Sequence, residues 1–163
     1  MQLYDLGSVS TLVVDDNRFM RSVVVNALTG LGVRNTYQAD GVDAALEMLA
    51  TNAVDLIISD WDMGEKSGID LIRRVRAHKP TRLVPIVMLT ANSTRRNLFA
   101  ARDAGVTEFL SKPVSAQSLY ARILEVIERP RQFIKTKDYF GPDRRRRRRA
   151  DYTGEKRRKG ERE

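Results

Sequence analysis

The sequence contains no cysteine, a single histidine and no long apolar run. The absence of cysteine rules out disulfide bonds and thiolate metal sites in these 163 residues. No apolar stretch reaches the roughly 20 residues that span a membrane, and residues 1–5 lack the basic and apolar regions of a signal peptide. His78 has no ligand partner near it in the sequence, so we expect it at the surface. These absences favour a cytoplasmic protein without membrane insertion.

The positive charge of the sequence is concentrated at one end. The whole chain has a formal net charge of +8. Residues 129–163 contain 15 Lys and Arg against 6 Asp and Glu, a net charge of +9, which leaves 14 basic and 15 acidic residues in 1–128. We therefore expect a near-neutral domain followed by a strongly basic tail, an asymmetry that points to a polyanionic partner.

Apolar strand patterns and helical patterns alternate through residues 9–128. Strands are predicted at 11–14, 33–38, 54–60, 83–89 and 106–110, and each is followed by a helix with apolar residues at helical spacing. Asn17 and Asp40 are predicted to cap the first two helices. Five strands alternating with five helices indicate βαβ units, and therefore an α/β fold with a three-layer parallel sheet.

Polar residues follow four of the five predicted strands. Asp15 and Asp16 follow the first strand, Asp60 ends the third, and Thr90 and Lys112 follow the fourth and fifth. The carboxyl ends of parallel strands meet at one edge, where open α/β sheets bind ligands. Clustered carboxylates suit Mg²⁺, and a carboxylate beside Mg²⁺, a hydroxyl and a lysine can attack a phosphoryl group. The alternative for the Asp15–Asp16 pair alone is plain helix capping.

Short motifs in the same region resemble the response-regulator receiver domain of the CheY-like family. The matching pieces are VVDD at 13–16, IISDWDM at 57–63, MLTA at 88–91 and FLSKP at 109–113. The resemblance implies a flavodoxin-like (βα)5 receiver with parallel sheet order 2-1-3-4-5. It places the receiver domain at 1–129, with a core at 9–128.

The resemblance also implies roles for individual residues. Asp60 would be the phosphoacceptor. Mg²⁺ would be held by Asp15, Asp16, Asp60 and the backbone carbonyl of Asp62. The phosphoryl contacts and the switch would involve Thr90, Lys112 and Phe109. The implied partner is a sensor histidine kinase or phosphotransfer protein, and the chain would not be an enzyme beyond self-catalysed phosphorylation and dephosphorylation.

Residues 130–163 form a basic tail that is predicted to be disordered when free. Six adjacent arginines repel one another and offer nothing to bury. The tail is too short for a DNA-binding or enzymatic output domain, so the output must come from the receiver surface, the tail or both.

The tail combines groups that together suit a guanine dinucleotide. Guanidinium groups hold phosphate and reach guanine edges, aspartates accept from guanine, and aromatic rings stack on bases. The candidate ligand residues are Tyr139, Phe140, Asp143, Arg144, Arg145, Arg146, Arg147, Arg148, Arg149, Asp151 and Tyr152, with a turn expected at Gly141-Pro142.

The segment YFGPDRRRRRRADY at 139–152 resembles the arginine-rich extension of stand-alone CheY-like regulators from flagellated bacteria. Those regulators bind cyclic di-GMP and act at the flagellar motor. The resemblance implies cyclic di-GMP as a ligand, a motor protein as a partner and recruitment to the flagellar pole. Two alternatives remain: a basic arm that binds nucleic acid, and a phosphoryl sink or relay protein in which the tail is dispensable. Membrane-surface binding lacks support because the tail has no amphipathic helix.

Overall fold

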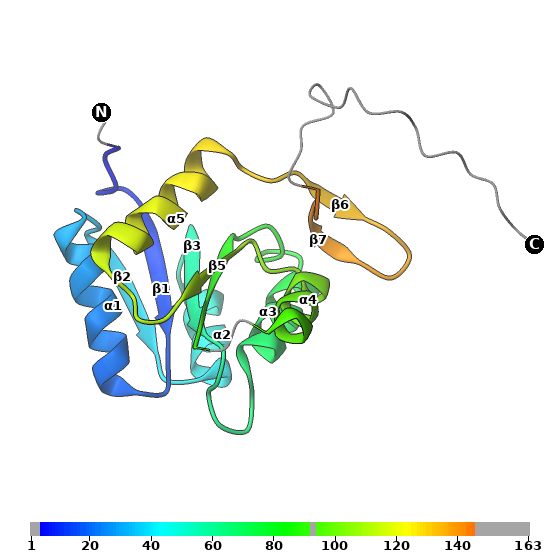
Figure 1. Ribbon diagram of the computed structural model, residues 1–163, viewed down its shortest axis with the longest axis horizontal. Coiled ribbons are helices and arrows are strands. Elements are labelled where there is room, and N and C mark those ends of the chain that lie inside the picture. Colours follow the sequence, from blue (N-terminus) through cyan, green and yellow to red (C-terminus); the bar gives the residue numbers. More distant parts are fainter. Residues whose placement is uncertain (1–3, 92–93, 146–163) are drawn as a thin grey trace, which may run out of the picture.

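The computed structural model describes residues 4–91 and 94–145, and its main body is a five-stranded parallel sheet between two layers of helices (Figure 1). The strands are β1 (Ser10–Val14), β2 (Asn35–Ala39), β3 (Leu56–Asp60), β4 (Ile86–Thr90) and β5 (Glu108–Ser111). The helices are α1 (Arg18–Gly30), α2 (Val42–Thr51), α3 (Gly68–Ala77), α4 (Arg95–Ala104) and α5 (Ala116–Glu128). The sheet order is β2-β1-β3-β4-β5, which confirms the flavodoxin-like prediction.

The sheet separates two apolar cores. Every residue of β3 and β4 is buried, as expected for strands covered on both faces. On one face, Ile57 and Met88 pack with apolar residues of α2, α3 and α4; on the other, Ile58 and Leu89 pack with residues of α1 and α5. The three-layer arrangement follows from this division.

The helix starts are fixed by polar side chains, with one exception. Asn17 accepts a hydrogen bond from the Met20 amide at the start of α1, as predicted. Ser67, Thr94 and Ser115 cap α3, α4 and α5 in the same way. The prediction that Asp40 caps α2 is wrong, because the N-cap position is Gly41, whose extended backbone leads directly into Val42.

The prediction of a tail disordered from residue 130 is wrong for its first part. Strands β6 (Phe133–Lys135) and β7 (Phe140–Pro142) pair in an antiparallel hairpin (Figure 1). The expected turn at Gly141-Pro142 is also wrong, since both residues are buried within β7. The charge of the tail as a whole obscured these short apolar stretches. The positions 146–163 lie outside the described residues.

The hairpin packs against the ends of α3 and α4 and the start of β5. The guanidinium carbon of Arg76 lies 4.9 Å from the centre of the Phe133 ring, and that of Arg82 lies 4.9 Å from the Phe140 ring. Arg76 is 6% exposed and donates from Nε to the carbonyl of Gly105, and burial lowers its pKa to about 10. Arg76 therefore links α3, the start of β5 and the hairpin. Within the described residues, no helix is long and apolar enough to cross a membrane.

Candidate functional site

The predicted acidic residues meet at the carboxyl edge of the sheet. Asp15 directly follows β1, and Asp60 is the last residue of the neighbouring strand β3. Carboxylate oxygens of Asp15, Asp16 and Asp60 all lie within 4.8 Å of one another. Asp15 and Asp60 are buried, whereas Asp16 is exposed. Parallel strands of matched register thus bring together side chains that are 45 residues apart in the sequence.

Asp15 has one buried oxygen with no protein partner. Its Oδ1 accepts a hydrogen bond of 2.8 Å from the Asn17 amide, while Oδ2 is buried without a hydrogen bond among the described residues. Burial raises the pKa of the Asp15 carboxyl; the Asn17 bond opposes this, and the nearby Asp60 adds to it. A carboxylate placed in this way is stabilised by a bound cation.

Lys112 supplies the only basic group that the structure ion-pairs with these carboxylates among the described residues. Its Nζ lies 2.6 Å from Oδ1 of Asp60. Its backbone amide donates to the Thr90 carbonyl, which fixes the start of the loop after β5, and the following Lys112–Pro113 peptide bond is cis. Three carboxylates and one ammonium leave two negative charges, so the donor set matches a hard divalent cation such as Mg²⁺.

The other predicted site residues lie near this edge but with different exposure. Thr90 is the last residue of β4 and is 3% exposed. Phe109 is half-buried in β5, opposite Met88 of β4. Asp62 is exposed in the loop after β3, and its carboxylate is not part of the three-residue cluster. The predicted use of its backbone carbonyl stays a prediction, as do the roles of Thr90 and Phe109.

The loop after Asp60 depends on glycine. Gly64 has a φ of +78°, which an L side chain rarely adopts and proline cannot. Gly68 begins α3 so close to β3 that a Cβ atom there would meet the Asp60 carbonyl and the Met88 side chain. Trp61 donates from its backbone amide to Leu89 and packs partly against the core, so it lies at the edge of the acidic site.

The tail residues predicted to bind a dinucleotide are only partly described. Tyr139 is half-buried, donates from Oη to the Pro142 carbonyl and carries the Arg144 guanidinium over its ring at 4.0 Å. The Asp143 carboxylate accepts from the Arg145 amide. The remaining residues of this prediction, Arg146 to Arg149, Asp151 and Tyr152, lie outside the described residues.

The structure also forms ion pairs that were not predicted from the sequence. Arg131 Nη2 lies 2.7 Å from Oε1 of Glu108, whose side chain is 5% exposed, and Arg144 Nη1 lies 3.1 Å from Oδ1 of Asp103. Glu108 gave one signal, since a carboxylate at the start of a buried strand needs a cationic partner. Arg102 of α4 gave none, because its surroundings depend on where the tail packs.

Comparisons with known proteins agree with this geometry. The family model for the response regulator receiver domain matches residues 11–124. The chemotaxis protein CheY of Pseudomonas aeruginosa is 40% identical over 118 residues, covering 72% of this chain and 95% of that protein. The chemotaxis protein CheY-3 of Vibrio cholerae is 36% identical over 122 residues, covering 75% of this chain and 94% of that protein.

Solved structures show the same fold. The chemotaxis protein CheY4 of Vibrio cholerae has a TM-score of 0.69 at 27% identity and covers 72% of this chain and 98% of its own. A response regulator receiver protein from Pseudomonas putida has a TM-score of 0.63 at 30% identity, with coverage of 74% and 95%.

Proposed function

This chain belongs to the response regulator receiver family, and we propose that it is a signalling protein that accepts a phosphoryl group on Asp60 with the help of Mg²⁺. The observation that carries the proposal is the cluster of Asp15, Asp16 and Asp60 within 4.8 Å, with Lys112 Nζ 2.6 Å from Asp60. A histidine kinase or phosphotransfer protein is the partner that receiver domains imply.

The chemistry is an in-line displacement at phosphorus. A carboxylate oxygen of Asp60 forms the new O–P bond while the P–N bond to a phosphohistidine breaks. The phosphohistidine ring, protonated on its other nitrogen, leaves as neutral imidazole. Mg²⁺, held by Asp15, Asp16, Asp60 and the Asp62 carbonyl, would neutralise charge on the phosphoryl oxygens. Lys112 stabilises the same charge from the side of β5. Thr90 and Phe109 would then report the phosphorylated state to the α4–β5–α5 face.

Phosphorylation of the full chain by acetyl phosphate tests this machinery. We expect the chain to incorporate one phosphoryl group, and only when Mg²⁺ is present. The rate of incorporation should fall by about a hundredfold in Lys112→Ala, the scale of losing one charged group that stabilises a transition state. Lys66→Ala is the matched control, because Lys66 forms an exposed ion pair with Asp43. Incorporation that survives chelation of Mg²⁺, or that is equal in both variants, would refute the mechanism.

We further propose that the arginine-rich tail binds cyclic di-GMP. The supporting observation is the combination of guanidinium, aromatic and carboxylate groups at 139–152, each of which has a use on guanine or phosphate. Arg144 leads the six-arginine run and is anchored to Asp103 of α4, so a tail ligand would be held near the receiver.

The proposed target is a protein of the flagellar motor, reached by recruitment to the flagellar pole. Two curated relatives are named as chemotaxis proteins, which supports a role in motility for this chain.

Calorimetry on the full chain separates this ligand from its rivals. Cyclic di-GMP is titrated into the wild-type chain and into a variant with arginines 144–149 changed to glutamine, with GTP and a DNA duplex as controls at about 0.15 M salt. Guanine-specific heat that disappears in the variant supports the proposal. Equal heat from any polyanion, with a steep dependence on salt, indicates a basic arm for nucleic acid instead.

A further inference from the structure

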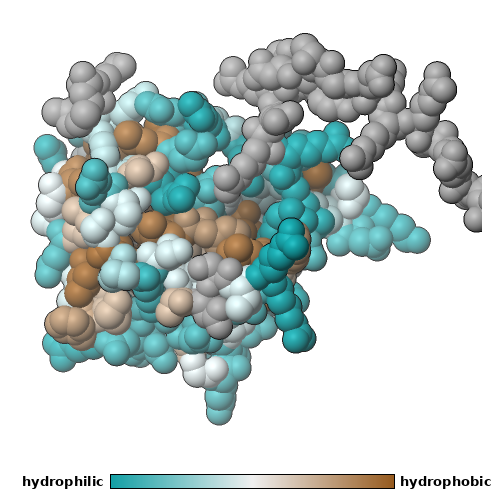
Figure 2. All heavy atoms as spheres, in the orientation of Figure 1, coloured by the Kyte–Doolittle hydropathy of each residue, from teal (hydrophilic) through white to brown (hydrophobic). Residues whose placement is uncertain are grey.

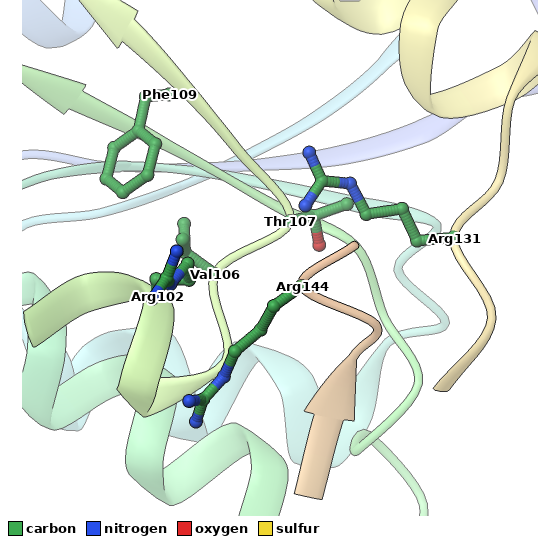
Figure 3. A pocket seen from close by; sticks show the side chains of 6 residues that line it. All are labelled: Arg102, Val106, Thr107, Phe109, Arg131 and Arg144. Atoms are coloured by element: carbon green, nitrogen blue, oxygen red, sulfur yellow. The ribbon is translucent and has the colours of Figure 1, made fainter. Parts of the chain in front are cut away.

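A cavity of about 240 Å³ lies between α4, β5 and the two ends of the hairpin segment (Figure 3). Six residues line it: Arg102, Val106, Thr107, Phe109, Arg131 and Arg144. Figure 3 shows Arg102 on α4, Phe109 on β5, and Arg131 and Arg144 on the segments that enter and leave the hairpin. The cavity therefore exists only because the hairpin is packed against the receiver.

The cavity is basic, although two of its three arginines are paired with carboxylates. Arg131 is paired with Glu108 and Arg144 with Asp103. A second arginine, Arg122, also faces Glu108, with its Nη1 3.9 Å from Oε2. The Arg102 guanidinium is stacked 4.8 Å from the centre of the Phe99 ring, where cation–π attraction holds it in place without neutralising it. An anion entering the cavity would thus meet a surplus of positive charge on a prearranged side chain.

Two of the arginines that line the cavity each have a buried Nε donor without an acceptor. The Nε atoms of Arg102 and Arg144 are buried and make no hydrogen bond within the part of the chain that the structure describes. Buried donors are normally satisfied, so each orphan needs an explanation such as an absent ligand. The two arginines come from different elements, α4 and the segment after β7. A tetrahedral oxyanion offers acceptors in several directions, whereas a carboxylate is planar.

We propose that this cavity binds a phosphate group of a nucleotide, with Arg102 and Arg144 donating to its oxygens. Phe109 and Val106 supply an apolar wall for the attached sugar or base. The volume lies below the roughly 300–1,000 Å³ of sites that enclose a whole drug-sized ligand, so the cavity takes one phosphate and its immediate neighbour. For cyclic di-GMP, the proposal rests on the function proposed above and adds Arg102, a receiver residue, to the binding site.

Binding here would join the tail to the receiver. A phosphate held by Arg102 and Arg144 bridges α4 to the start of the arginine run. The same ligand would then add a contact between the hairpin and the receiver beyond the two ion pairs already present.

Nuclear magnetic resonance on the full-length, isotope-labelled chain tests the proposal. The probes are inorganic phosphate, 5′-GMP and cyclic di-GMP at constant ionic strength, and the readouts are the backbone amides of Val106, Thr107 and Phe109. Arg102→Gln removes the guanidinium group and its charge, and Arg102→Lys keeps the charge but removes Nε. Arg96→Gln is the matched control, because it removes the same charge from an exposed position of α4.

In the wild type, we expect 5′-GMP to shift the three amides, and we expect both Arg102 variants to weaken binding about tenfold, the loss of one charge-assisted hydrogen bond. Arg96→Gln should bind as the wild type does. Absence of shifts at these amides in the wild type would overturn the proposal, as would Arg102 variants that bind as tightly as Arg96→Gln.

Cyclic di-GMP distinguishes this proposal from the function on which it builds. If 5′-GMP binds the cavity but cyclic di-GMP does not bind the chain, the cavity assignment holds and the dinucleotide function fails. If cyclic di-GMP binds with unchanged affinity in both Arg102 variants, the tail still binds the dinucleotide and the cavity assignment fails.

Discussion

At the scale of single residues, Asp15 carries an electrostatic cost in the acidic site. Burial removes the hydration of its carboxylate, and Asp60 adds a second negative charge nearby, so its pKa is raised. The exposed Asp16 shares the cluster without that burial. A divalent cation bound at the cluster would offset this cost in the folded protein.

The sign of this effect gives a pH prediction for the metal-free protein. A carboxyl whose folded pKa is raised favours folding while it is protonated, and that stability is lost as pH rises through the raised pKa. Asp15→Asn removes the titrating group, so it should unfold at a higher temperature than the wild type at neutral pH, and this advantage should vanish below the ordinary pKa of aspartate.

With Mg²⁺ present, the wild type should unfold at a higher temperature than Asp15→Asn. Asp15→Asn should lose Mg²⁺ affinity by at least about tenfold, the loss seen even for groups that only support metal ligands. Thermal unfolding at several pH values, with Mg²⁺ and with a chelator, measures both effects. Glu65→Gln, which changes an exposed carboxylate in the loop after β3, is the control. If the unfolding temperatures of Asp15→Asn and Glu65→Gln depended on pH in the same way without metal, Asp15 would not carry this cost.

At the scale of elements, the receiver strands and helices could be predicted from the sequence because their signals are local. Apolar runs bounded by polar residues mark β1, β3 and β4, and helical spacing marks the helices. The parallel topology then brings Asp15 and Asp60 to one edge. Boundaries are harder to predict: the sequence predicts the fourth strand from residue 83, but β4 begins at Ile86, just after Pro85.

The hairpin could not be predicted because its stability is not local. Strands β6 and β7 have three residues each, too few to persist alone in water. Arg76 and Arg82 hold the two strands, and Glu108 holds Arg131 just before them; these contacts appear only in the folded molecule. The basic cavity depends on the same docking, so Arg102 carried no signal in the sequence.

Close backbone packing gives a test of hairpin docking. A Cβ atom on Gly141 would lie 2.6 Å from Tyr139 Oη and 3.0 Å from the Gly105 Cα atom. Gly141→Ala should therefore loosen the hairpin at a cost of about 1–3 kcal/mol, the range for overpacking. Amide hydrogen exchange should accelerate in β6 and β7 and stay unchanged in β1 and β3.

Gly41→Ala is the control for this substitution, because nothing lies within 4 Å of a Cβ at that extended position. Hairpin protection that is equal in the two variants would show that residues 133–142 do not pack as described.

At the scale of the whole molecule, the acidic site lies at the carboxyl ends of the parallel strands, and the hairpin lies near their amino ends. Asp60 ends β3, whereas Glu108 begins β5 and contacts the tail. Figure 2 shows hydrophilic side chains over the hairpin and the neighbouring helices, which suits a surface held together by charged and cation–π contacts. The tail is thus joined to the receiver before any ligand is added.

Removal of the hairpin should consequently destabilise the receiver. A chain ending at Glu128 loses the Arg131–Glu108 pair and the Phe133 ring over Arg76, so its free energy of unfolding should fall by about 1–3 kcal/mol. A chain ending at Arg145 keeps these contacts and should match the full chain. Urea denaturation compares the three, and equal stability of the two shortened chains would show that the hairpin contributes nothing to the fold.

Peptide mapping by mass spectrometry shows whether Asp60 is the residue that receives the phosphoryl group. The full chain is treated with Mg²⁺ and acetyl phosphate, the acyl phosphate is trapped by reduction with borohydride, and the modified residue is located. We expect a single modified position, Asp60, and none in Asp60→Asn. Modification at Asp15, Asp16 or Asp62 in the wild type, with Asp60 unmodified, would contradict this prediction.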